Sequence, residues 1–358
     1  MLGKKNRPYL IAEISSNHNG NLDNAKKLIL EAKIFGADAV KLQTYTPQSM
    51  TINSSKKIFK IKEGIWKGYS LWDLYKRAHT PYKWHKKLFD YAKNIGIKIF
   101  STPFDEKAVD FLEKLKCPFY KVASFEMTDI PLIKKIASTK KRIIISTGMA
   151  SLKEIETTFN YAKSFGIKKI TLLYCVSNYP SKIEDFNLNN ISIMKKKFNC
   201  EVGFSDHSTD NTIASAASLA GATVIEKHIS LKKIKALDSK FSISGGEILS
   251  YRRHINNPNY FIKKRTYNKL LGKKNFYRSK TEDKSKIFRR SLFIVKKVKK
   301  GDKFNNSNLK KIRPGFGISP VFYENIIGQK SNVEIKKGEP LSARLVKKTG
   351  IVLNEKNR

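Results

Sequence analysis

Residues 9–44 read YLIAEISSNHNGNLDNAKKLILEAKIFGADAVKLQT and contain a complete strand–helix–strand unit. The runs Tyr9–Ser15 and Ala39–Thr44 have the apolar, β-branched composition of buried strands. Between them, apolar side chains recur at helical spacing and a glycine follows: Leu22, Ala25, Leu28, Ile29, Ala32, Phe35 and then Gly36. Two strands joined through a helix predict a parallel pair.

The same alternation continues to about Ser250. With the first two, eight runs have the pattern of strands: Tyr9–Ser15, Ala39–Thr44, Lys98–Thr102, Tyr120–Ser124, Ile143–Thr147, Thr171–Cys175, Glu201–His207 and Thr223–Ser230. Helical spacing lies between them, for example over Tyr82–Asn94 and Leu152–Phe165. Eight strands alternating with helices predict a (β/α)8 TIM barrel, to which we assign residues 1–255. The long insert Thr46–Thr80 carries Trp66, Trp72 and Tyr75, and we expect it to pack over the barrel mouth.

The pattern changes after the barrel. Residues 256–290 are rich in Lys, Arg and Asn, and we interpret them as a linker without a functional site. Residues 291–350 open with a strand pattern, Ser291–Val298, and contain two similar pieces, Val298–Phe304 and Ile335–Leu341. Each piece has a glycine turn followed by an acidic and an apolar residue, which predicts a small, mainly β domain.

The charge of the chain is strongly positive. Its 358 residues include 71 Lys and Arg against 30 Asp and Glu, a formal net charge of +41. The basic residues are spread along the whole chain, and no zinc-finger or basic-aromatic RNA motif accompanies them, so we expect anionic small substrates rather than a nucleic-acid partner. No apolar run reaches membrane-spanning length, and three distant cysteines indicate a reducing, cytoplasmic setting without disulfides.

Polar residues follow each apolar run at the end where a barrel keeps its active site. Lys41 and Lys121 stand within predicted strands, and hydroxyl residues follow nearby strands at Thr102, Ser124 and Ser205. Lysines and hydroxyls together suit a phosphate and carboxylate clamp. The alternative is a structural network in which the two lysines pair with Glu13 and Glu126.

Two histidines end neighbouring strands. His207 and His228 are separated by one helix–strand unit, so their imidazoles could share a divalent metal ion. A pair of structural histidines is the alternative, but the adjacent carboxylates Asp206 and Glu226 favour a metal, because ligating histidines usually have such partners. Cys175 has no obvious histidine partner and is interpreted as an inert buried thiol.

The ordered motifs resemble the sialic acid synthase family along nearly the whole chain. They are Glu13-Ile-Ser-Ser-Asn-His-Asn-Gly20, Lys41-Leu-Gln-Thr44, Ser101-Thr-Pro-Phe104, Lys121-Val-Ala-Ser124, Ser205-Asp-His207 and Glu226-Lys-His228. Lys311-Ile-Arg-Pro-Gly315 resembles the motif of that family's C-terminal antifreeze-like (SAF, β-clip) domain. Gly64-Ile-Trp66, Leu71-Trp-Asp-Leu-Tyr75 and other insert residues are most similar to the pseudaminic acid synthases.

The resemblance implies a transferase that condenses phosphoenolpyruvate with 2,4-diacetamido-2,4,6-trideoxy-L-altrose and water, giving pseudaminic acid and phosphate. It implies a divalent cofactor (manganese, magnesium or cobalt) and a domain-swapped homodimer. The implied phosphoenolpyruvate contacts are Lys41, Thr102, Lys121, Ser124, Ser177 and Ser205, and the implied metal ligands are His207 and His228. Glu13 and Glu226 are the implied catalytic carboxylates. The implied sugar contacts are Gln43, Glu126, Tyr179, Asp238 and, from the partner subunit, Arg313.

One position departs from the resembled pattern. The sialic-type enzymes carry Asn where this chain has Ser177, so that either Ser177 or Asn178 could contact the phosphate. N-acetylneuraminate and legionaminate synthases share the chemistry with another sugar and are the nearest alternative. A polyanion-binding protein on a retained barrel is the alternative from a different class.

Overall fold

The computed structural model describes residues 1–4 and 6–353. Eight parallel strands form a closed barrel in sequence order, because β1 pairs with both β2 and β8. The strands are β1 (Tyr9–Glu13), β2 (Ala39–Thr44), β3 (Lys98–Pro103), β4 (Tyr120–Val122), β5 (Ile143–Ser146), β6 (Ile170–Cys175), β7 (Glu201–Asp206) and β8 (Val224–Ser230). This confirms the predicted TIM barrel.

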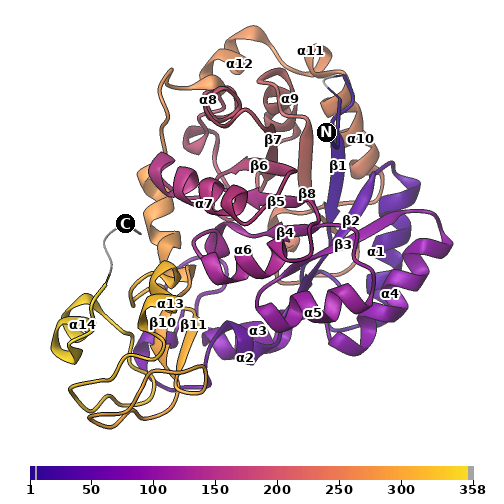
Figure 1. Ribbon diagram of the computed structural model, residues 1–358. Coiled ribbons are helices and arrows are strands. Elements are labelled where there is room, and N and C mark those ends of the chain that lie inside the picture. The colour runs from indigo at the N-terminus through magenta and orange to yellow at the C-terminus, as the bar shows by residue number, and fades with distance from the viewer. Residues whose placement is uncertain (5, 354–358) are drawn as a thin grey trace.

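Helices surround the barrel (Figure 1). They are α1 (Leu22–Ile34), α4 (Tyr82–Asn94), α5 (Glu106–Lys114), α6 (Ile130–Ala137), α7 (Leu152–Ser164), α8 (Asn189–Phe198), α9 (Asn211–Leu219) and α10 (Gly246–Asn256). Each buries an apolar stripe, as α1 does with Ala25, Leu28, Ile29 and Ala32. Side-chain caps mark several helix starts; Asn21, for example, accepts from the backbone N–H groups of Asp23 and Asn24. A short strand, β9 (Ile243–Ser244), pairs in parallel with the end of β8.

The insert folds against both the barrel and the C-terminal unit, which we define as residues 291–350. It contains α2 (Pro47–Met50) and α3 (Leu71–Ala78). Met50 and Phe59 of the insert share one apolar cluster with Phe104 of the barrel and with Phe293 and Ile312 of the C-terminal unit. The insert therefore joins the barrel mouth to the small unit, which lies at the lower left of Figure 1.

The C-terminal unit is built on the antiparallel pair β10 (Ser291–Ile294) and β11 (Leu309–Ile312). It also contains α13 (Tyr323–Ile326) and α14 (Ala343–Thr349). The expected first strand, Ser291–Val298, ends early, but Val298 forms an isolated antiparallel bridge with Ile335. The two similar sequence pieces thus meet each other and enclose a separate apolar cluster with Phe304 and Leu341.

Residues 256–290, expected to be a linker, contain α11 (Pro258–Phe261), α12 (Lys264–Leu271) and the 3-10 segment η5 (Lys280–Phe288). Leu270 is buried in the barrel cluster, and Phe276 packs against it. A few apolar side chains among many lysines are enough to hold this segment on the barrel. In the described part of the chain, no helix has the length and apolarity needed to span a bilayer.

Candidate functional site

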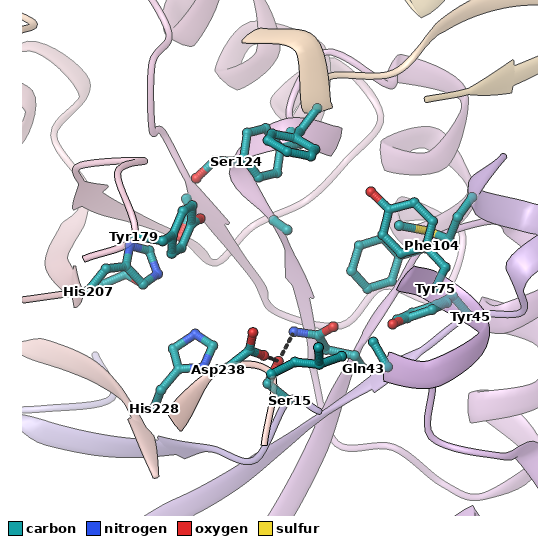
Figure 2. Close-up of a pocket in the computed structure, with 18 of the residues that line it drawn as sticks. Ser15, Gln43, Tyr45, Tyr75, Phe104, Ser124, Tyr179, His207, His228 and Asp238 are labelled. Carbon is teal, nitrogen blue, oxygen red and sulfur yellow. Dashed lines mark hydrogen bonds between the residues drawn. The ribbon is translucent and has the colours of Figure 1, made fainter. Parts of the chain in front are cut away.

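A pocket opens at the carboxyl ends of the barrel strands, with a cavity of about 140 Å³. Strand residues form one part of its wall, including Lys41, Lys121, Ser205, Glu226 and His228. The insert and the C-terminal part of the chain form another part with Trp66, Tyr75, Phe288 and Arg313. Figure 2 shows His207 and His228 at one side of this pocket and the aromatic rings of Tyr45, Tyr75 and Phe104 at the other.

Glu226 is the centre of a buried charge network. Its carboxylate accepts from Lys121 Nζ at 2.9 and 3.0 Å and from Ser205 Oγ at 2.9 Å. Lys41 Nζ lies 3.7 Å from the same carboxylate. Burial alone would raise the pKa of Glu226, but Lys121 and Lys41 hold that pKa well below its ordinary range. Glu226 is therefore an anion that organises two cations.

Glu13 is the second carboxylate of this network and lies at the end of β1, between β2 and β8. Its register partner is Lys41, whose Nζ lies 2.6 Å from Glu13 Oε2 and donates to Thr102 Oγ1 at 3.2 Å. Gln43 Nε2 donates to Glu13 Oε1 at 3.0 Å. Burial raises the pKa of Glu13 although Lys41 opposes the shift. Glu13 therefore holds a proton more readily than a free carboxyl group, as does Asp238, whose pKa burial also raises.

The lysine pairing differs in part from the structural alternative. Lys41 pairs with Glu13 as that alternative required, but Lys121 pairs with Glu226 and not with Glu126. Closure of the barrel brings Glu226 of β8 across the mouth to Lys121 of β4. Burial lowers the pKa of Lys121 despite this contact. The two lysines face two carboxylates, Glu13 and Glu226, so the network is balanced in charge before any anion binds.

The imidazoles of His207 and His228 lie together, with ring centroids 5.5 Å apart. His207 Nδ1 lies 3.0 Å from the carbonyl oxygen of Val176, so this nitrogen carries the proton and Nε2 keeps its lone pair. Burial lowers the pKa of His207 to about 4. Burial, followed by the neighbouring His207, also lowers the pKa of His228. Both rings are therefore neutral at pH 7 and available as ligands.

The pair fits a divalent metal ion. His228 Nδ1 is buried and lacks a hydrogen-bond partner among the described residues. Within residues 1–4 and 6–353, no group of three or more His, Cys, Asp or Glu side chains is arranged to hold an ion. A metal here would be held by the two imidazoles and would keep positions for substrate and water, as catalytic sites do.

Asp206 does not support the histidines as expected. Its carboxylate accepts from Tyr251 OH at 2.8 Å and lies 3.2 Å from Lys227 Nζ. Consecutive strand residues point to opposite faces, so Asp206 and Lys227 face the helices while His207 and His228 face the pocket. The prediction of a carboxylate partner was wrong for Asp206, and a backbone carbonyl orients His207 instead.

Ser124 and Ser177 lie against Gly148, which has φ +38°. A Cβ added to Gly148 would stand 2.5 Å from Ser177 Oγ and 2.5 Å from Ser124 Cβ. Ser177 Oγ is buried and has no partner among the described residues. Asn178, by contrast, already donates to Asp185 at 3.0 Å. Ser177 is therefore better placed than Asn178 for an anion beside Ser124.

Cys175 lies beneath these serines and is inert. Ser124 Oγ is 3.1 Å from its Sγ, and the Gly148 backbone N–H donates to the same sulfur at 3.2 Å. Burial raises the pKa of the thiol. The interpretation of a structural cysteine agrees with this environment.

Asp238 and Tyr179 line the pocket between its two ends. Ser15 Oγ donates to Asp238 Oδ2 at 2.5 Å, and Gln43 Nε2 donates to Ser15 Oγ at 3.0 Å, as the dashed lines of Figure 2 show. The ring of Tyr179 lies 4.5 Å from that of His207. Polar groups and an aromatic face are therefore available to a hydroxylated ligand next to the histidines.

Glu126 holds two arginines at the far end of the pocket. Arg313 Nη2 and Arg290 Nε donate to Glu126 Oε1 at 2.7 and 3.1 Å, and Arg313 Nη1 donates to Tyr75 OH at 2.9 Å. We expected Arg313 to come from a partner subunit. In the structure, the arginine of the same chain occupies the pocket, because β11 delivers it directly above its own barrel.

Several residues at or beside the pocket were not among the predicted site residues. Phe288 belongs to the segment interpreted as a linker, and Tyr45 and Phe104 follow β2 and β3. Arg290, from the same segment as Phe288, reaches Glu126 behind the pocket wall. The pairing of Ser291 with Ile312 sets Arg290 beside Arg313. That pairing is long-range and no local pattern reveals it.

Comparison with known proteins agrees with this geometry. The NeuB family model matches residues 28–266, and the SAF domain model matches residues 289–347. A pseudaminic acid synthase of Campylobacter jejuni is 42% identical over 93% of this chain and 95% of its own length. An N,N'-diacetyllegionaminic acid synthase of the same species is 37% identical over 93% and 98%.

A solved structure is similar over almost the whole length. The spore coat polysaccharide biosynthesis protein SpsE of Bacillus subtilis has a TM-score of 0.80 at 28% identity, and the match covers 99% of this chain and 98% of that chain. The family model spans most of the barrel, and the relatives extend through the C-terminal unit. On these grounds the chain belongs to the NeuB family.

Proposed function

We propose that the chain is a pseudaminic acid synthase, which condenses phosphoenolpyruvate with 2,4-diacetamido-2,4,6-trideoxy-L-altrose. The observation that carries the proposal is one pocket lined by Lys41, Lys121, Glu226 and the neutral imidazoles of His207 and His228, with Glu13 buried against Lys41. The similarity to pseudaminic acid synthases over 93% of the chain supports this choice of sugar.

The lysine end binds phosphoenolpyruvate in this proposal. Lys41 and Lys121 offer charge-assisted hydrogen bonds to its phosphate and carboxylate. Hydroxyl donors surround them at Thr102, Ser124, Ser177 and Ser205. Ser205 and Lys121 already contact Glu226, so an arriving anion would share donors that the protein has positioned in advance.

His207 and His228 would hold the divalent ion, which would supply Lewis-acid polarisation of the sugar aldehyde when bound. The methylene carbon of phosphoenolpyruvate forms a bond to the aldehyde carbon, the π electrons of the aldehyde pass to its oxygen, which takes up a proton, and positive charge develops on the carbon that bears the phosphate. Glu226 and Glu13 lie beside the lysines that bind this substrate and stabilise that charge. Water then adds to the same carbon, with Glu13 accepting a proton, and phosphate leaves.

The sugar occupies the rest of the pocket. Gln43, Tyr179 and Asp238 face its hydroxyl and acetamido groups, and Arg313, held by Glu126, reaches it from above. The apolar neighbours Phe104 and Phe288 provide a place for the 6-methyl group. A sugar with a hydroxyl at that carbon would bury a polar group without a partner, which is unfavourable.

We also propose a homodimer that exchanges C-terminal units. In domain exchange, the contacts made within one chain are the same as those made between two copies. The Glu126–Arg313 contact seen here in one chain would then form between subunits. The resemblance supports exchange, and the C-terminal unit has only a small core of its own, so it needs the barrel as a docking surface.

Release of phosphate from phosphoenolpyruvate, measured with a panel of amino sugars and metal ions, tests the function. We expect the altrose-configured sugar to be used about 100-fold better than N-acetylmannosamine, the scale on which one misplaced hydroxyl discriminates. Equal use of N-acetylmannosamine, or preference for the legionaminate precursor, would assign the chain to a related synthase. Tight binding of polyanions without metal-dependent turnover would favour the binding-protein alternative.

A further inference from the structure

The segment between the two matched domain models contacts the anion end of the pocket. The models cover residues 28–266 and 289–347, which leaves residues 267–288 outside both. This stretch includes η5, and η5 lies against the end of β6, where Ser177 follows the strand. A charge-rich connection is thereby placed next to residues that bind substrate in the proposed function.

Three hydrogen bonds between η5 and residues 177–178 hold the chain in place after β6. The Ser177 backbone N–H donates to Glu282 Oε1 at 2.8 Å, and Ser285 Oγ donates to the Ser177 carbonyl at 2.5 Å. Asn178 Nδ2 donates to Thr281 Oγ1 at 2.8 Å. Both backbone groups of Ser177 are therefore held from one side, and its hydroxyl is left without a partner beside Gly148.

The contacts next to η5 brace the same strand ends. Arg278 Nη1 donates to the Cys175 carbonyl at 2.8 Å, and Arg278 Nη2 donates to Thr147 Oγ1 at 2.8 Å. Thr147 directly precedes Gly148, and Cys175 lies two residues before Ser177. Glu282 is 1% exposed, and burial raises its pKa although Arg278 opposes the shift, while Oε1 accepts from the Ser177 N–H.

We propose that Glu282 and Ser285 are positioning residues, which orient Ser177 so that its hydroxyl meets the phosphate of phosphoenolpyruvate. The inference rests on the proposed function. It assigns to residues 267–288 a role in the affinity for the anion, separate from the choice of sugar and from the metal.

Glu282→Ala tests this role. Loss of one hydrogen bond that orients the loop should raise the KM for phosphoenolpyruvate about 10-fold, while kcat and the KM for the sugar change less than about twofold. Affinity for inorganic phosphate, measured by calorimetry on the full chain, should fall by a similar factor. Glu282→Gln should restore both values, because its amide oxygen can accept from the Ser177 N–H.

Asp283→Ala is the matched control, because Asp283 is exposed on the same 3-10 segment and pairs with Lys286. It should leave both affinities unchanged. If Glu282→Ala fails to fold, Ser285→Ala provides the same test, because it removes the hydrogen bond to the Ser177 carbonyl. Unchanged phosphate affinity in a folded Glu282→Ala or Ser285→Ala chain overturns the inference. A wild-type chain that binds phosphate but condenses no sugar would instead overturn the proposed function.

Discussion

At one end of the pocket, the charged side chains stand on barrel strands: Lys41 on β2, Lys121 on β4 and Glu226 on β8. At the other end, Trp66, Phe288 and Arg313 come from an insert, a 3-10 segment and the C-terminal unit. The first group is fixed by the hydrogen-bonded ladder of a closed barrel. The second depends on how separate pieces dock. In the proposed function, the barrel determines the reaction and the docked pieces determine the sugar.

The largest loss is expected from the strand-borne histidines. His207→Ala or His228→Ala should lower turnover by more than about 100-fold, because even a residue that only orients a metal ligand contributes about 10–100-fold. Phosphate release measures the loss, and thermal melting should show that the chain still folds. His79→Ala, outside the pocket lining, is the control. Full activity in either variant, or in a chelated wild type, would contradict the metal site.

Arg313→Ala should produce the next largest effect and shows whether the docked half belongs to the same chain. It removes charge-assisted contacts worth about 1.5–3 kcal/mol each, so kcat/KM for the sugar should fall up to about 100-fold. Co-refolding Arg313→Ala chains with His228→Ala chains should regain activity if the C-terminal units are exchanged. Heterodimers that form but stay inactive would show that Arg313 acts only within its own chain.

Lys121→Met tests whether the two ends of the pocket bind different substrates, by comparing the KM for phosphoenolpyruvate with the KM for the sugar. Loss of one charge-assisted hydrogen bond should raise the KM for phosphoenolpyruvate by about 10-fold or more and leave the KM for the sugar nearly unchanged. Lys227→Met is the matched control, since Lys227 is equally buried but faces the helices. It should lower the melting temperature without changing either KM. Equal changes in both KM values for Lys121→Met would remove the distinction between the two ends.

Tyr75→Phe should have the smallest effect. It removes the hydroxyl that accepts from Arg313 and keeps the ring in its apolar cluster. The bond has a charged donor and is worth about 1.5–3 kcal/mol, but Arg313 keeps its contact with Glu126, so the KM for the sugar should rise only about 2–10-fold. Steady-state kinetics at saturating phosphoenolpyruvate would measure it. If the KM for phosphoenolpyruvate changed more than the KM for the sugar, the assignment of Tyr75 to sugar binding would be wrong.

The pocket residues on the barrel strands could be predicted from the sequence, because hydrophobic periodicity located the strands and position along each strand located the pocket end. Lys41 and His228 stood in apolar runs whose carboxyl ends converge in any barrel. The partner of Lys121 was not predictable from neighbouring residues, because Glu226 is close only after β8 has closed on β1. Asp206 was predictable but was misjudged: it follows Ser205 directly and precedes His207, so strand alternation already placed it on the other face.

The pocket residues that come from the insert, from residues 256–290 and from the C-terminal unit were harder to predict from the sequence. The composition of residues 256–290 indicated a solvated linker, and the few buried side chains, such as Leu270 and Glu282, do not form a periodic pattern. Arg313 was found through a motif, whereas Arg290 depends on the pairing of β10 with β11. Docking between separate pieces leaves little local signal, and only the assembled chain reveals it.

One oxygen atom, Glu126 Oε1, accepts from both arginines that flank the open end of the β10–β11 pair. The three side chains therefore form one unit. Replacing either arginine alone leaves the carboxylate with one partner, but replacing Glu126 would leave two buried cations without their shared carboxylate. Loss of Glu126 should therefore cost more stability than loss of either arginine.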